Sequence, residues 1–81
     1  MKLHPRAIVR MRERGASASE VELTITAGER FPAKFGRQGI RRNFGFDGLW
    51  RARRYHIKQV EVFAAWEDDD WLVIRVLVKY S

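Results

Sequence analysis

The chain of 81 residues contains no cysteine, which excludes a disulfide framework and a thiolate metal site. No apolar run approaches the ~20 residues that a membrane span needs, and the N-terminus lacks the apolar core of a signal peptide. Repeats, linkers and low-complexity stretches are also absent. We therefore expect a single domain over residues 1–81 that stays in the cytoplasm and makes no membrane contact.

Acidic residues are the scarcer charge. Ten Asp and Glu stand against sixteen Lys and Arg, which leaves a net charge of +6. The excess is segregated: residues 1–14 carry net +4 and residues 29–58 carry net +7. Twelve of the basic residues are arginine, whose planar guanidinium suits phosphates and stacked bases. A merely solubilising role would not require this segregation, so we expect an anionic partner, RNA above all.

The first fifteen residues predict a short basic helix. Pro5 suits the first turn, where its missing N–H costs nothing. Ala7, Ile8 and Met11 fall on one face at helical spacing. Gly15 suits the left-handed position that ends a helix, so the expected helix covers residues 5–14.

A second helix is expected over residues 18–27. Ser17 and Glu20 form the pattern of a capping box, and Gly28 ends the segment. The apolar residues between 21 and 25 also alternate as they do in a strand. The capping box favours the helix.

The rest of the chain predicts an antiparallel sheet of three or four strands, and the fold class is therefore α+β. The expected strands are residues 30–35, 39–46, 49–66 and 71–80. Asp47 and Gly48 have the sequence of a two-residue hairpin turn. Tyr55 and Ile57 do not continue the alternation of apolar residues that begins at Val60, so we expect a bulge near Lys58. The last strand is apolar on both faces, so we expect it at the centre of the sheet.

Basic and aromatic side chains are interleaved over residues 37–58. Alternate side chains of adjacent strands share a face, so we expect a cationic sheet face with aromatic rings for stacking unpaired bases. The alternative is that the aromatic rings turn into the core. The candidate RNA-binding residues are Arg37, Arg41, Arg42, Trp50, Arg51, Arg53, Arg54 and Tyr55.

His56, Lys58 and Glu61 are the candidate catalytic groups. Cleavage of RNA without a metal needs a base, an acid and cations near the phosphorane, and these residue types can supply all three. One histidine near a lysine and a glutamate is also a common chance arrangement. The chain has no paired histidines and no glycine-rich phosphate loop, so we expect neither a metal site nor a cofactor.

Several motifs resemble those of a known family. The opening His4-x5-Arg-Met-x-Glu-Arg-Gly15, the Ser-x-x-Glu cap and the closing Val-Lys-Tyr resemble domain-of-unknown-function family 4258. Residues 34–37, 41–44, 50–51 and 58–62 look like one of its subgroups. Such domains are similar to RelE/ParE-like and BrnT-like toxins, in which helices pack on an antiparallel sheet. The chain departs from this pattern at Arg75, where similar domains carry threonine.

The resemblance implies a ribonuclease toxin that an antitoxin protein holds inactive. The first functional expectation is therefore a RelE/BrnT-like, metal-independent endoribonuclease that binds RNA on a basic sheet face. The second is a module of the same fold that binds RNA, the ribosome or a protein without cleavage. Salt-dependent affinity for nucleic acid without cleavage would distinguish the second from the first.

Overall fold

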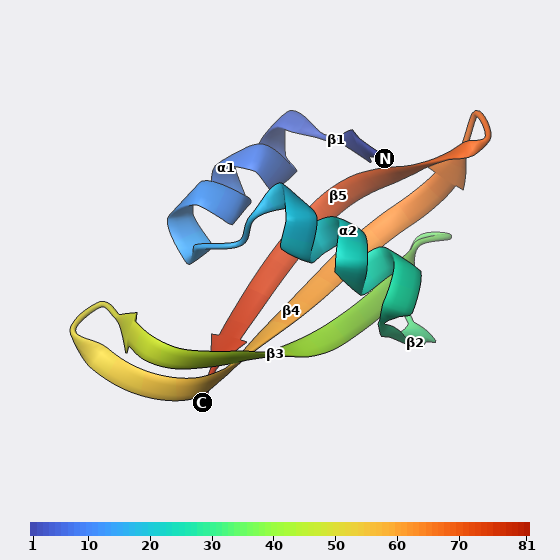
Figure 1. The fold of residues 1–81 in the computed structure, drawn as a ribbon. Coiled ribbons are helices and arrows are strands. Elements are labelled where there is room, and N and C mark those ends of the chain that lie inside the picture. The colour runs from blue at the N-terminus through green and yellow to red at the C-terminus, as the bar shows by residue number, and fades with distance from the viewer.

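The computed structural model describes residues 1–81 and contains two helices and five strands. In chain order these are β1 (Lys2–Leu3), α1 (Pro5–Arg14), α2 (Ala18–Ala27), β2 (Glu29–Pro32), β3 (Gln38–Trp50), β4 (Arg53–Glu67) and β5 (Asp70–Tyr80). Both helices lie on the same face of a twisted sheet (Figure 1). The molecule is elongated, with principal extents of 40, 24 and 21 Å. Neither helix is long and apolar enough to span a lipid bilayer.

Both helices occupy the expected ranges because their ends are set by local signals. At the start of α1, the His4 imidazole Nδ1 accepts a hydrogen bond from the Arg6 N–H at 3.1 Å. At its end, Gly15 adopts a left-handed φ of 77°. The capping box of α2 is complete, since Ser17 and Glu20 each accept the other's backbone N–H. The strand alternative for this segment is therefore wrong.

The sheet has five strands, where three or four were expected, and their order β1-β5-β4-β3-β2 corrects two further expectations. The sheet is not purely antiparallel, because β1 pairs in parallel with β5. A strand of two residues has no periodicity that a sequence could show. The central strand is β4 rather than β5. The outer edge of β5 is instead partly covered by β1 and by α1, from which Arg14 Nη1 donates to the Val76 carbonyl at 2.6 Å.

The β3–β4 hairpin turns later than expected. Strand β3 continues through Asp47 and Gly48, and the turn consists of Arg51 and Ala52, with φ of 50° and 67°. Two left-handed central residues are typical of the type I′ turn. The positive φ that the Asp-Gly pair favours occurs in an irregularity within β3, where Asp47 has φ 42° and the register shifts.

The bulge expected near Lys58 lies just before it. The N–H groups of His56 and Ile57 both donate to the Ser81 carbonyl, at 2.8 and 2.9 Å. Two consecutive donors to one acceptor shift the phase of β4, so Tyr55 and Lys58 both lie on the side of Tyr80. A second register shift, at Phe63 and Ala64, was not expected.

The core lies between the helices and the covered sheet face. Its members are aliphatic side chains and one methionine that are almost fully buried: Ala7, Met11, Ala16, Val21, Ile25, Ile40, Val60, Val62, Ala64, Val73 and Val76. Thr24 is buried among them, and its hydroxyl donates to the Glu20 carbonyl at 2.7 Å. Lys58 is also buried, whereas the other basic side chains lie around this core.

Candidate polyanion-binding surface

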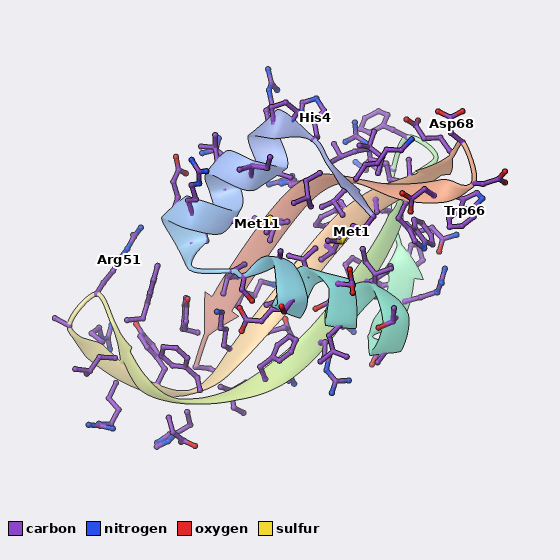
Figure 2. All side chains as sticks on the ribbon, turned by 45° about the horizontal axis from the view of Figure 1, so that its top comes forward. Met1, His4, Met11, Arg51, Trp66 and Asp68 are labelled. Carbon is purple, nitrogen blue, oxygen red and sulfur yellow. The ribbon has the colours of Figure 1, made fainter.

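The β3–β4 hairpin projects beyond the other strands as an arm, residues 45–57 (Figure 1). It projects because β2 pairs with β3 no further than Arg41, and β5 pairs with β4 only from Lys58 onward. The arm carries three exposed arginines that contact no carboxylate: Arg51, Arg53 and Arg54. Arg51 lies at the tip of the arm (Figure 2).

The aromatic residues of the arm pack against Tyr80. Trp50 stacks on its ring at 4.9 Å between centroids, and Tyr55 and Phe46 contact it at 5.5 and 5.2 Å. The Tyr80 hydroxyl donates to the Arg14 carbonyl at 2.8 Å. Burial, with the negative charge of Glu20, raises the pKa of Tyr80. Trp50 and Tyr55 are thus half-buried against Tyr80 and attach the arm to the end of α1, outside the hydrophobic core.

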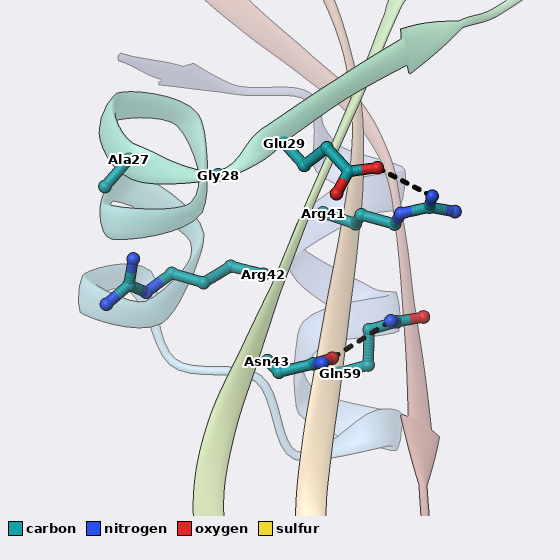
Figure 3. A pocket seen from close by; sticks show the side chains of 7 residues that line it. All are labelled: Ala27, Gly28, Glu29, Arg41, Arg42, Asn43 and Gln59. Atoms are coloured by element: carbon teal, nitrogen blue, oxygen red, sulfur yellow. Dashed lines mark hydrogen bonds and ion pairs between the residues drawn. The ribbon is translucent and has the colours of Figure 1, made fainter.

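Arg41 and Arg42 lie on opposite faces of β3 (Figure 3). Arg41 Nη2 pairs with the Glu29 carboxylate at 2.8 Å. Arg42 points toward α2, its guanidinium lies 5.5 Å from the centre of the Phe44 ring, and its buried Nε has no hydrogen-bond partner. The two arginines therefore do not share one cationic sheet face.

The three candidate catalytic side chains are not brought together. Lys58 is 6% exposed on the helix side, where its Nζ donates to the Gly15 carbonyl and to Glu20 Oε1 at 2.7 Å. Glu61 is three residues further along β4, on the opposite sheet face, and pairs with Lys79 at 3.0 Å. His56 lies exposed on the arm, with Nδ1 3.0 Å from Asp47 Oδ1. No single bound phosphate can contact all three.

Three arginines of α1 form a row that sequence reasoning did not single out. Arg6, Arg10 and Arg14 recur every four residues, which places them on one side of the helix. Together with Arg37, Arg75 and Ile74 they line a pocket of about 300 Å³. The four-residue spacing was a visible signal, whereas the proximity of Arg37 and Arg75 was not.

A second pocket continues the row toward the arm. It has a volume of about 380 Å³ and is lined by Arg14 and Arg51, together with Trp50, Tyr80, Glu13 and Val78. Arg14 lines both pockets, so they adjoin. We call the continuous row the arginine track; its members are Arg51, Arg14, Arg10, Arg6, Arg75 and Arg37.

Most of this positive charge has no internal counterion. Of the twelve arginines, only Arg10 and Arg41 have a carboxylate within 4.0 Å. The acids without an ion-pair partner are Glu22 on α2 and Glu67 and Asp69 near the β4–β5 turn. The arginine track and the arm therefore present uncompensated guanidinium groups, which suit an external polyanion.

Comparison of the chain with protein-family models, with curated proteins and with solved structures found no match. Groups of three or more His, Cys, Asp or Glu side chains placed to hold a metal ion are also absent from the structure. The functional interpretation therefore depends on the geometry and the charge of the arginine track and the arm.

Proposed function

We propose that the domain binds single-stranded RNA along the arginine track and the arm. The observation that carries the proposal is the uncompensated charge: five of the six track arginines and the two further arginines of the arm, Arg53 and Arg54, contact no carboxylate. Guanidinium groups bind phosphates through paired N–H donors, and such contacts dominate affinity for nucleic acid.

A single strand fits this surface better than a duplex. The track passes through two pockets and changes direction from the arm to α1, and then to the loop between β2 and β3. A flexible strand can follow such a path, and its unpaired bases can enter pockets or stack on side chains. Binding requires no convergence of proton-transfer groups, in agreement with the separation of Lys58 from Glu61.

The test is the salt dependence of RNA affinity, compared between two double variants. Arg51→Ala with Arg53→Ala removes two charges from the arm. Lys2→Ala with Arg30→Ala removes the same charge near the other end of the sheet, since Lys2 pairs with Asp68 and Arg30 lies over the Trp71 ring. Figure 2 shows Asp68 at the opposite end of the molecule from Arg51. Each lost phosphate contact reduces the magnitude of the slope of log affinity against log salt by about 0.7 for single strands. The slope of the arm variant should therefore be smaller in magnitude than that of the wild type by about 1.4. The control should retain the wild-type slope.

Two results would count against the proposal. Equal losses in both double variants would show that net charge alone attracts the RNA. Absence of measurable binding by the folded wild-type domain at low salt would exclude RNA as the partner. Thermal unfolding of each variant separates lost binding from lost folding.

A metal-independent endoribonuclease remains the second candidate, because one pair on the arm favours it. The Asp47 carboxylate lies 3.0 Å from His56 Nδ1, both side chains are 78% exposed, and Arg53 and Arg54 are nearby in sequence. A carboxylate can hold an imidazole ring in one orientation, as proton transfer to RNA would require. Such an enzyme would fit the toxin-like expectation and an antitoxin partner.

Induced expression in a bacterial host distinguishes the two candidates. Growth arrest with discrete new RNA 5′ ends, both lost in His56→Ala while RNA binding persists, would establish cleavage through the His56–Asp47 pair. Normal growth and intact RNA in the presence of folded wild-type protein would exclude cleavage and leave RNA binding as the only remaining candidate.

A further inference from the structure

We propose that the end of the arginine track near Phe35 is a subsite for a phosphorylated nucleotide end. A terminal phosphate monoester would lie among Arg6, Arg37 and Arg75, and its base would stack on Phe35. The inference rests on the proposed function and deepens it, because it names the chemical group that this part of the surface recognises.

The first observation is the charge of the pocket. Five of its six lining residues are arginines, and no acidic residue lines it. Arg10 pairs with Glu13 at 2.9 Å and Arg14 donates to the Val76 carbonyl, whereas Arg6, Arg37 and Arg75 have no carboxylate partner. A terminal phosphate carries up to two charges and three free oxygens, which can accept from several guanidinium groups at once. An internal phosphodiester offers one charge and two such oxygens.

The second observation is an apolar pocket that adjoins the charged one. It has a volume of about 180 Å³ and shares Arg37 and Arg75 with the arginine pocket. Its other lining residues are Ala33, Lys34, Phe35 and Phe63. The Arg37 and Arg75 guanidinium groups lie 5.8 Å from the ring centres of Phe35 and Phe63, respectively. A ligand with an anionic part and a planar apolar part would therefore contact both pockets across these two arginines.

The third observation is the conformation of Phe35. Its side chain is 86% exposed, and its backbone has a φ of 63°, in the left-handed region that disfavours a bulky side chain. Phe35 and Gly36, which has a φ of 68°, form a turn that the Arg37 N–H closes on the Lys34 carbonyl at 3.3 Å, and Phe35 occupies a turn position without being buried in the core. Aromatic side chains held in solvent beside cationic groups are the platforms on which proteins stack unpaired bases.

The experiment compares the affinity of the full chain for one short single-stranded RNA in three forms: 5′-phosphorylated, 3′-phosphorylated and with hydroxyls at both ends. We expect one phosphorylated form to bind at least tenfold more tightly than the hydroxyl form. Arg75→Ala and the milder Arg75→Gln should abolish this preference, and both should fold because Arg75 is exposed. Phe35→Ala should weaken the preferred RNA roughly tenfold, and Phe35→Trp should retain it. Arg53→Ala is the matched control, which should weaken all three forms equally.

A nucleoside monophosphate compared with its nucleoside separates the two sources of a phosphate monoester. Preference for the phosphorylated RNA end over the free monophosphate supports an RNA-end subsite. Preference for the monophosphate over the nucleoside, without any RNA binding, supports the phosphate subsite and overturns the RNA-binding function. Equal affinity for all three RNA forms overturns the subsite and leaves RNA binding intact.

Discussion

Replacement of Lys58 by methionine tests whether this lysine stabilises the fold or acts on a substrate. Its Nζ is enclosed between the two helices and the sheet, donating to the Gly15 carbonyl and to Glu20 Oε1 at 2.7 Å. Methionine keeps much of the side-chain volume and removes the charge. The Glu20 carboxylate, 24% exposed, then loses its counterion.

The size of the effect follows from this burial. Removal of one partner of a buried ion pair costs about 3–5 kcal/mol. Glu20 keeps partial solvent contact and the N–H of Ser17 at 2.9 Å, so we expect a loss of about 2–3 kcal/mol. In a domain of this size, that loss lowers the midpoint of thermal unfolding by roughly 10–20 °C.

The pH dependence gives the prediction a second signature. Partial burial alone would raise the pKa of Glu20, but hydrogen bonds from Lys58 and Ser17 outweigh it and hold that pKa below its ordinary value. A carboxyl with a lowered folded pKa contributes stability above its unfolded pKa, and this contribution is lost as pH falls through the folded pKa. Without Lys58 the lowering is weakened, so the difference between wild type and Lys58→Met should shrink in acid.

The assay is urea unfolding of both proteins at pH 7 and at about pH 3, below the ordinary carboxyl range. Lys2→Met is the control, because Lys2 and Asp68 are 51% and 84% exposed in their pair; it should cost less than about 1 kcal/mol. RNA affinity of Lys58→Met, measured where it is folded, should match wild type. Unchanged stability would refute the structural role of Lys58. Loss of RNA binding by a folded Lys58→Met variant would show that Lys58 contributes to the binding site.

Two further predictions concern packing, and urea unfolding measures both. Gly28→Ala should destabilise by about 1–3 kcal/mol, because a Cβ would meet the backbone oxygens of Thr24 and Arg41 at 2.4 and 2.7 Å. Gly45→Ala, with nothing within 4 Å of its added Cβ, should change stability by less than about 1 kcal/mol; similar losses at both glycines would contradict the close approach of α2 to β3. Ile40→Ala should cost about 2–5 kcal/mol, since Ile40 is fully buried, and a loss below about 1 kcal/mol would mean that this part of the core is not closely packed.

The elements with local signals were predictable from the sequence. Pro5 and Gly15 bound α1, and Ser17 with Glu20 begins α2, since each acts on backbone groups within a few residues. The prediction of a hairpin turn at Asp47 and Gly48 was wrong, because residues that favour a positive φ occur in β-bulges as well as in hairpin turns. The arm continues past it, and Trp50 and Tyr55 meet Tyr80, a residue from the far end of the chain.

The candidate site, like the fold, was predictable from the sequence only in part. Composition and charge segregation, visible in the sequence, determined that the chain carries an excess of arginine. Only the tertiary structure decided where that excess acts, because it brings Arg6 of α1 to Arg37 of a loop and Arg75 of β5 around one pocket. It also placed Lys58 and Glu61 on opposite faces of one strand, where separate ion pairs hold them. Charge is a property of composition, whereas the distance between two charges depends on strand register, bulges and helix packing that no local segment encodes.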